Sequence, residues 1–332
     1  MQAPADVRVA VLLATCNGAP YIGQQLESLT QNVTRFTLHW LDDHSTDDTR
    51  TLVRERALSL GVELKEWHQP ERQRLPGAFF QLLESADADI YFFCDQDDIW
   101  QAGKIDTAVA ELAPDLGSAV LGFSDSLMFY DDAPEVVRRV SEVFGSSPRD
   151  AMEESRVFMT VIAPGHTQCF TRPLREVYLA HKDIARTYAR NHDAWMYLIA
   201  TAVGTVRMLP DIPTALYRQH DANVTAGLLR GGRRLDRRAL TWKQYQALRP
   251  RVARHAQGFL LAAPTLAPSH RLERLVALAG RVARLDRRQS AAELLKLAGA
   301  GALWPNRRWA LGFAAACLWS DAVASKVVPT MV

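Results

Sequence analysis

Short apolar runs alternate with amphipathic stretches along the first two thirds of the chain. Five of these runs have the length and composition of strands, at residues 9–14, 36–41, 62–67, 90–94 and 119–123. Several of them are followed by segments with helical spacing, and strands that alternate with helices are typical of βαβ units. The pattern therefore predicts an α/β fold, in which helices cover a mostly parallel, Rossmann-like sheet.

The pattern changes at about residue 228, where the strand signals end. Apolar residues then recur at helical spacing, as in Leu272, Leu275, Val276, Ala279, Val282 and Ala283. Gly231-Gly232 marks the junction, and Pro264 and Pro268 interrupt the helical region. We predict two domains, an α/β domain over residues 1–227 and an α-helical C-terminal region over residues 228–332.

The distribution of charge divides the chain at the same place. Residues 228–332 hold 19 Lys and Arg against 5 Asp and Glu. The whole chain has 39 basic and 37 acidic residues, so 20 basic and 32 acidic ones remain in residues 1–227. A basic segment of this kind is attracted to phosphate-rich surfaces, either an anionic membrane or nucleic acid. Because no nucleic-acid-binding motif accompanies it, we expect no nucleic acid partner.

Composition excludes several classes of protein. With 48% hydrophobic residues, the 332-residue chain is long and apolar enough to bury a full core, which argues against intrinsic disorder. Cys16, Cys94, Cys169 and Cys317 lack the close spacing of a zinc site or a redox pair, so we expect four reduced thiols. We find no signal peptide and no run of about 18 apolar residues, which predicts a protein made in the cytoplasm.

Two acidic clusters come directly after predicted strands, where the ligands of open α/β sheets bind. In the first, Asp42-Asp43-His44-Ser45-Thr46-Asp47, we favour turn and helix-capping roles for Ser45, Asp47 and the following Asp48. The second, Asp95-Gln96-Asp97-Asp98, places three carboxylates within four residues, which is more than capping needs. A divalent cation would relieve their repulsion, and oxygen ligands suit Mg²⁺ or Mn²⁺.

A metal held by one or two carboxylates usually takes further ligands from substrate phosphates, so the second cluster indicates a nucleotide-diphosphate site. No P-loop sequence is present, which argues against a P-loop NTPase. The turn after the first predicted strand reads Ala14-Thr15-Cys16-Asn17-Gly18 rather than Gly-x-Gly-x-x-Gly, which disfavours a dinucleotide-dependent dehydrogenase.

Five sequence blocks between residues 7 and 226 resemble the inverting family 2 glycosyltransferases, in particular their bacterial rhamnosyltransferase-like branch. The blocks are residues 9–29, Leu41-Asp-Asp-His-Ser-Thr-Asp47, Asp95-Gln-Asp-Asp-Ile-Trp100 followed by Lys104, His192-Asp-Ala-Trp195, and Tyr217-Arg-Gln-His220 with Asn223-Val224. Three positions depart from the family pattern: His44 replaces a glycine, Cys16 an aromatic residue, and Ala78 an asparagine that precedes Phe79.

The resemblance implies a GT-A fold that binds a nucleotide-sugar and a divalent metal, Mg²⁺ or Mn²⁺, and transfers the sugar with inversion. It implies that Asp193 is the general base, for which a helix-capping role is the alternative. It also implies donor contacts for Thr15, Asn17, Asp42, Asp43, Asp95 and Lys104, and a metal held by Asp97, Asp98 and His220. For His220, an ordinary loop histidine is the alternative interpretation.

His166 and Trp195 are candidates for the acceptor side of the site. His166 lies in Gly165-His166-Thr167-Gln168, before a predicted helix, and a helix-cap role is equally favoured for it. Aromatic faces suit the apolar side of a sugar ring, so Trp100 and Trp195 are candidates for stacking, with core packing as an equally good interpretation.

The leading hypothesis is a metal-dependent, inverting glycosyltransferase that transfers rhamnose from a dTDP-sugar to a glycan or lipid-linked glycan in bacterial surface polysaccharide synthesis, such as that of O-antigen. The basic C-terminal region favours a peripheral location at the inner face of the cytoplasmic membrane, with an interfacial stretch that contains Trp304, Trp309, Phe313 and Trp319. The alternative is a non-catalytic GT-A scaffold or binding module within a polysaccharide-assembly complex.

Overall fold

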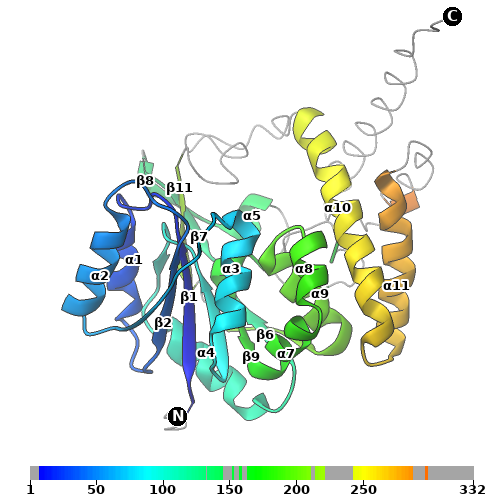
Figure 1. Cartoon of the computed structure of the whole chain (residues 1–332), viewed down its shortest axis with the longest axis horizontal. Coiled ribbons are helices and arrows are strands. Elements are labelled where there is room, and N and C mark those ends of the chain that lie inside the picture. Colours follow the sequence, from blue (N-terminus) through cyan, green and yellow to red (C-terminus); the bar gives the residue numbers. More distant parts are fainter. Residues whose placement is uncertain are drawn as a thin grey trace, which may run out of the picture.

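The computed structural model describes residues 7–131, 133–144, 152, 157–158, 163–210, 214–220, 242–286 and 296–297. A seven-stranded sheet lies at the centre of this part of the chain, between layers of helices (Figure 1). Its strands are, in spatial order, β10 (Thr205–Met208), β6 (Val120–Phe123), β9 (Gln168–Thr171), β4 (Ile90–Cys94), β1 (Val9–Thr15), β2 (Thr37–Asp42) and β3 (Glu63–Trp67).

The sheet is mostly parallel, as the sequence predicts. The neighbours β4, β1, β2 and β3 run parallel, and so do β6 and β10. Only β9 runs antiparallel to its two neighbours, β4 and β6, among the described strands of this sheet. All five predicted strands are present, as β1, β2, β3, β4 and β6.

Helices connect the strands in the expected βαβ order and continue after them. The first three lie between successive strands from β1 to β4: α1 (Ile22–Leu29), α2 (Thr49–Ser59) and α3 (Arg74–Ser85). The later ones are α4 (Lys104–Leu112), α5 (Val140–Phe144), α7 (Arg172–Ala180), α8 (Lys182–Tyr188), α9 (His192–Val203), α10 (Trp242–Ala262) and α11 (His270–Val282). Contrary to the prediction, residues 165–168 lead into a strand: the short helix η3 (Gly165–Thr167) is followed by β9, and α7 comes only then.

A second, four-stranded sheet carries one of the sequence motifs to the main sheet. Its strands are, in spatial order, β5 (Ile99–Trp100), β11 (Ala215–Gln219), β7 (Leu127–Tyr130) and β8 (Ala133–Arg139). Because β11 pairs with β5, which directly follows the acidic loop after β4, residues 217–220 lie beside that loop.

The core consists of two apolar layers, one on each face of the main sheet. Successive side chains of a strand point to opposite faces. Val11 of β1 accordingly belongs to a cluster with α1 and α4, whereas Leu12 belongs to one with α3, α7, α8 and α9. Both side chains are fully buried, which is why β1 and β4 read as continuous apolar runs rather than as alternating ones.

Helices α10 and α11 extend the second of these layers, at the edge of the molecule beyond α8 and α9 (Figure 1). Phe259 of α10 and Leu275 of α11 are buried in the same apolar cluster as Leu198 of α9. The predicted break is present between the two helices, where η4 (Ala263–Thr265) ends α10 and the Ser269 hydroxyl caps α11. The predicted junction at Gly231-Gly232 and the aromatic stretch from Trp304 to Trp319 lie outside the described residues.

Candidate active site

The predicted motifs converge at one edge of the main sheet, the edge formed by the carboxyl ends of the parallel strands. Thr15 at the end of β1 is in register with Asp42 at the end of β2, and Leu13 of β1 is in register with Cys94 at the end of β4. The turn after β1 and the two acidic loops therefore lie next to one another, where ligands of such sheets bind.

A network of short hydrogen bonds holds the turn after β1 against the loop after β2. Asp42 accepts hydrogen bonds from the Thr15 hydroxyl at 2.9 Å and the Ser45 backbone N–H at 2.9 Å, and it pairs with Arg50 at 2.7 Å. Burial raises the pKa of Asp42, but these donors outweigh it and lower the pKa below the ordinary value. Asn17 adds two bonds: its N–H donates to Ser45 Oγ at 2.8 Å, and its Oδ1 accepts from the Thr46 N–H at 2.8 Å.

His44 stands where the family pattern has glycine, and its backbone shows why glycine is usual. Its φ of 63° lies in the left-handed region, which costs energy for a residue with a Cβ atom. Asn17 also adopts this region, with a φ of 52°. In the same loop Asp47 Oδ1 accepts the N–H of Thr49, the first residue of α2, at 3.1 Å, whereas the N-cap residue itself, Asp48, makes no side-chain cap hydrogen bond.

Asp43 holds the segment that leads into α3. Its two carboxylate oxygens accept the backbone N–H groups of Gln73 at 2.6 Å and Arg74 at 2.7 Å. Arg72, just before them, donates to Cys16 Sγ at 2.8 Å, so this segment reaches back to the turn after β1. Asp42 and Asp43 are thus largely occupied by protein donors, and contacts of theirs with a nucleotide stay a prediction.

Asp97 and His220 meet at the acidic loop after β4, where their side chains are only 15% and 8% exposed. His220 Nε2 lies 2.8 Å from Asp97 Oδ2, although the two residues are 123 positions apart. The His220 ring stacks on Tyr21 with 4.4 Å between ring centroids. This contact brings together two of the three predicted metal ligands.

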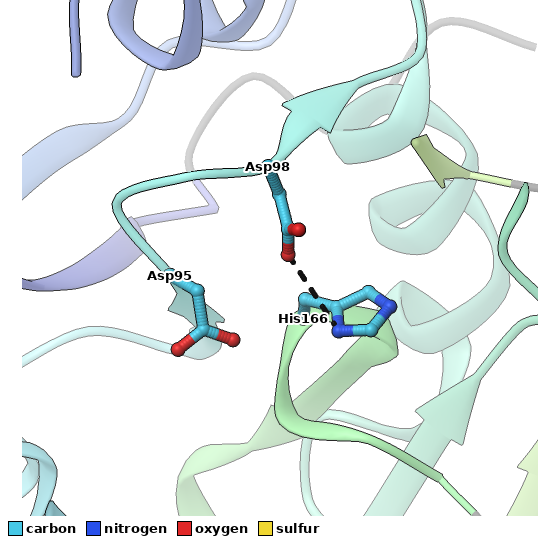
Figure 2. A group of neighbouring side chains, drawn as sticks. All are labelled: Asp95, Asp98 and His166. Atoms are coloured by element: carbon cyan, nitrogen blue, oxygen red, sulfur yellow. Dashed lines mark ion pairs between the residues drawn. The ribbon is translucent and has the colours of Figure 1, made fainter. Parts of the chain in front are cut away.

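Asp98, the third predicted metal ligand, points into the interior instead. Its side chain is fully buried, its Oδ1 accepts the Arg218 backbone N–H at 3.2 Å, and its Oδ2 lies 3.6 Å from His166 Nδ1. Figure 2 shows Asp98 and His166 directed toward one another, with Asp95 beside them. Burial and the negative charges of Asp97 and Asp95 raise the pKa of Asp98 well above its ordinary value.

Asp95, Asp98 and His166 could also hold a metal ion, since their ligand atoms lie within 4.8 Å of one another. A cation is already present there, however. The ammonium of the buried Lys104 donates to the His166 carbonyl, lies 3.7 Å from the centroid of the Trp100 ring, and acts electrostatically on both carboxylates. Burial and Lys104 lower the pKa of His166 to about 3, so its ring is neutral at pH 7.

Asp193 lies in the first turn of α9 and is held from two sides. Its Oδ1 accepts the Ala194 N–H at 2.7 Å, and its Oδ2 accepts the Gly165 N–H of η3 at 3.2 Å. The N-cap residue of α9 is Asn191, but the Ala194 N–H belongs to the same first turn, so Asp193 also holds the start of the helix and its role as the base stays a prediction. Burial, together with the negative charges of Asp97 and Asp193, raises the pKa of Asp95 to about 7, which places Asp193 within electrostatic reach of the acidic loop.

Three sequence-based site assignments are corrected by burial. Trp195 is fully buried and meets the His255 ring edge-on at 5.7 Å, so it packs the core rather than the acceptor side. His166 is 2% exposed, with its Nε2 3.0 Å from Ser126 Oγ, and belongs to the layer beneath the acidic loop. Lys104 is 3% exposed and occupied by His166 and Trp100, so it does not reach a donor diphosphate.

The sequence did not indicate the importance of Arg218, although it lies in one of the motifs. Its guanidinium donates to the Asp97 carbonyl at 2.9 Å, to Asp131 at 2.5 Å and to Gln24 of α1. Arg218 directly follows Ala215, Leu216 and Tyr217 in β11. An arginine at the end of such a run is the signal that would have found it, because a buried guanidinium needs partners.

Comparisons with known proteins agree with this geometry. Residues 10–139 match the family model described as glycosyl transferase family 2. A curated protein of Shigella flexneri, the dTDP-rhamnosyl transferase RfbG, is 26% identical over 228 residues, which cover 64% of this chain and 72% of that protein.

Two solved structures share the fold. S. aureus TarS, residues 1–349, has a TM-score of 0.57 and 15% identity over 96% of this chain and 91% of that chain. The mannosyltransferase PcManGT from Pyrobaculum calidifontis, solved with GDP-Man and Mn²⁺, has a TM-score of 0.51 and 21% identity over 95% of this chain and 87% of that chain. The protein is therefore a glycosyltransferase with the GT-A fold, and it carries a family 2 glycosyltransferase domain.

Proposed function

We propose that the protein is an inverting, metal-dependent enzyme that transfers rhamnose from a dTDP-sugar to a glycan or lipid-linked glycan during the synthesis of a bacterial surface polysaccharide. The donor is suggested by the relative named as a dTDP-rhamnosyl transferase. A nucleotide-sugar donor in general is supported by the fold neighbours, of which TarS was solved with UDP-GlcNAc and PcManGT with GDP-Man.

The observation that carries the proposal is the grouping of Asp97, His220, Asp95 and Asp193 at the carboxyl edge of the sheet. Asp97 and His220 converge at 2.8 Å, and Asp193 accepts the N–H of Gly165, whose neighbour His166 lies 3.6 Å from Asp98 in the same acidic loop. A transferase needs a group to balance the leaving diphosphate and a base to accept the proton of the attacking hydroxyl. These four side chains offer both within one site, next to Thr15 and Asn17 on the donor side.

The residues present fit a divalent metal at Asp97 and His220. A carboxylate oxygen and an imidazole nitrogen are directed at one another, and both groups are ligands that Mn²⁺ accepts. When bound, such an ion would balance the charge of the donor diphosphate. Two protein ligands leave coordination positions for phosphate oxygens, as is usual for ions that bind with a nucleotide.

Asp193 serves as the base in this proposal. The acceptor hydroxyl oxygen forms a bond to the anomeric carbon, the bond from that carbon to the diphosphate oxygen breaks, and the hydroxyl proton passes to Asp193. The N–H groups of Ala194 and Gly165 fix the carboxylate from behind, which limits the positions available to its oxygens. A single displacement of this kind inverts the anomeric centre.

The basic C-terminal helices support a peripheral association with an anionic membrane surface. Arg271, Arg274 and Arg284 of α11 and its 3-10 extension η5 (Ala283–Asp286) are exposed, and Glu273 is the one exposed acidic side chain described in α11. Among the described residues, no helix is long and apolar enough to cross a membrane. A lipid-linked acceptor would be reached from such a surface.

Thermal unfolding with Mn²⁺ and one nucleotide at a time tests the donor assignment. At a concentration about 100 times the dissociation constant, a bound nucleotide should add roughly 2.7 kcal/mol of stability. We expect the largest Mn²⁺-dependent rise in melting temperature with dTDP, compared with UDP and GDP, and transfer of rhamnose from the dTDP-sugar. A larger rise with UDP or GDP would mean that the donor carries that nucleotide instead of dTDP. No rise with any nucleotide would favour the non-catalytic scaffold.

A further inference from the structure

Helix α10 lies directly against the Arg190-Asn191 turn, which precedes Asp193 in the chain. His255 in the middle of α10 is fully buried, and its Nδ1 accepts the backbone N–H of Arg190 at 3.2 Å. Since Nδ1 is the acceptor, the ring proton is assigned to Nε2. Burial, and then the positive charge of Arg190, lower the pKa of His255 to about 3, so the ring stays a neutral acceptor at pH 7.

Arg251, one helical turn before His255, holds the next residue of the same turn. Its Nη2 lies 3.3 Å from Asn191 Oδ1 and 3.4 Å from the Arg190 carbonyl oxygen. Asn191 is the N-cap of α9, in an extended conformation, and its carbonyl accepts the Trp195 N–H at 3.1 Å. The first turn of α9, which contains Asp193, thus starts from a residue that α10 contacts.

Close packing keeps α10 at this position. A Cβ atom on Gly258 would lie 2.3 Å from Tyr188 Cβ, so only glycine allows α10 to approach the end of α8 this closely. The His255 ring also meets the Trp195 ring edge-on, with ring centroids 5.7 Å apart. Residues 188–195 are therefore bounded by α10 at both ends.

We propose that α10 belongs to the catalytic unit, with His255 and Arg251 as positioning residues that fix the Arg190-Asn191 turn and thereby the orientation of Asp193. This inference rests on the proposed role of Asp193 as the base. The helix has a role in transfer that does not depend on a membrane, and the basic C-terminal region is not only a surface anchor.

Two variants of His255 separate positioning from packing. His255→Leu keeps an apolar side chain but removes the acceptor of the Arg190 N–H, and His255→Asn retains an oxygen acceptor close to the position of Nδ1. We expect His255→Leu to lower kcat by roughly 10- to 100-fold, since small displacements of a catalytic group have effects of this size. His255→Asn should restore kcat toward the wild-type value.

Arg251→Ala should lower kcat in the same direction and to a smaller extent. Arg254→Ala is the matched control, because Arg254 is an exposed arginine of the same helix whose guanidinium contacts the Tyr188 ring rather than the Asp193 turn. Nucleotide affinity in the presence of Mn²⁺ should be unchanged in all four variants. The proposal would be overturned if a folded His255→Leu protein kept the wild-type kcat. It would also be overturned if this variant lost nucleotide affinity by the same factor as kcat.

Amide hydrogen exchange gives a readout that does not depend on activity. In His255→Leu, a peptide that covers residues 188–195 should exchange faster, whereas the strands of the main sheet should exchange as in the wild type. Unchanged exchange at 188–195 would overturn the contact itself. A different pattern would overturn the assignment of the base instead. In that pattern, His255→Leu exchanges faster at residues 188–195 but keeps its kcat, and the separate Asp193→Asn variant also keeps its transfer activity.

Discussion

The proposed donor side and the proposed base side of the site are held in different ways. On the donor side, Asp42 accepts the N–H of Ser45, three residues later, and Asp47 accepts the N–H of Thr49, two residues later. On the base side, Asp193 is bound by Gly165, 28 residues away, and Arg190 by His255, 65 residues away. The donor side thus adds local contacts to contacts between motifs, such as that of Thr15 with Asp42, whereas the base side depends on Gly165 and on His255, which lie outside the motifs. Motifs therefore reveal the first side more fully than the second.

The largest effects should come from one substitution on each side. Asp193→Asn should lower transfer by about 10²–10⁴-fold, because it removes the proton acceptor, and should leave Mn²⁺-dependent stabilisation by nucleotide intact. Asp97→Asn should abolish both transfer and that stabilisation. The transfer rates of the two variants and their melting temperatures with and without Mn²⁺ and nucleotide check this. If both variants lost nucleotide-dependent stabilisation to the same extent, the two sides of the site would not be separate.

Two glycines provide a comparison of packing on the two sides. A Cβ atom at Gly165 would lie 2.7 Å from Nε2 of His192, whose ring is fixed between Phe79 at 4.1 Å and Phe93 at 4.5 Å. Gly165→Ala should therefore destabilise the fold by roughly 1–3 kcal/mol and lower kcat as well.

At Gly18, the atom that a Cβ would meet is Oε1 of Gln96, the end of a flexible side chain. Gly18→Ala should cost less, about 0.5–1.5 kcal/mol, mainly through the bond that Gln96 accepts from the Cys16 N–H at 2.8 Å. Urea denaturation of both variants measures the difference. Equal losses would show that His192 can move as easily as Gln96.

Acid should weaken both sides through buried neutral histidines. Burial and the nearby Lys65 lower the pKa of His39 in β2 to about 4, against the opposing effect of Glu63, and the pKa of His255 is lowered to about 3. The unfolded chain takes up these protons near pH 6.5, before the folded one does. The contribution of these histidines to the free energy of unfolding is therefore fully present above about pH 6.5. It falls as the pH decreases toward 4, by up to about 1.4 kcal/mol per pH unit for each histidine.

Melting temperatures between pH 7 and 5 test this, with His39→Phe as the comparison. The Phe variant keeps an aromatic ring, although one larger than imidazole, and should lose part of the pH dependence. Trp67 Nε1 also loses its acceptor, which lies at 3.2 Å. The same pH dependence in wild type and variant would assign the effect to other groups.

The smallest effect is expected at the surface of the donor side. Arg50 pairs with Asp42 at 2.7 Å but is 48% exposed, and Asp42 keeps the donors of Thr15 and Ser45 without it. Arg50→Ala should therefore cost only about 0–1 kcal/mol, measured as a change in the urea midpoint. A larger loss would mean that the local network depends on its exposed member.

The sequence-based site assignments that the structure corrects are those of side chains that turn out to be buried. Lys104, His166 and Trp195 were placed against donor or acceptor because each lies in or near a motif, yet all three are buried. Their surroundings come from α9, α10 and the layer beneath the acidic loop, and no local pattern specifies these contacts. For Trp195 in particular, the partner is His255 of α10, which the sequence assigns to a separate region.

The sequence by itself determined five of the seven strands of the main sheet, the order of their βαβ units, the resemblance to family 2 glycosyltransferases and the position of both acidic loops. Apolar periodicity and turn chemistry act over a few residues, so they are legible along the chain. Only the tertiary structure decided that Asp97 meets His220, that Asp98 turns inward to His166, and that α10 supports the turn before Asp193. These contacts join residues 60 or more positions apart, and which side chain is buried depends on how whole layers pack.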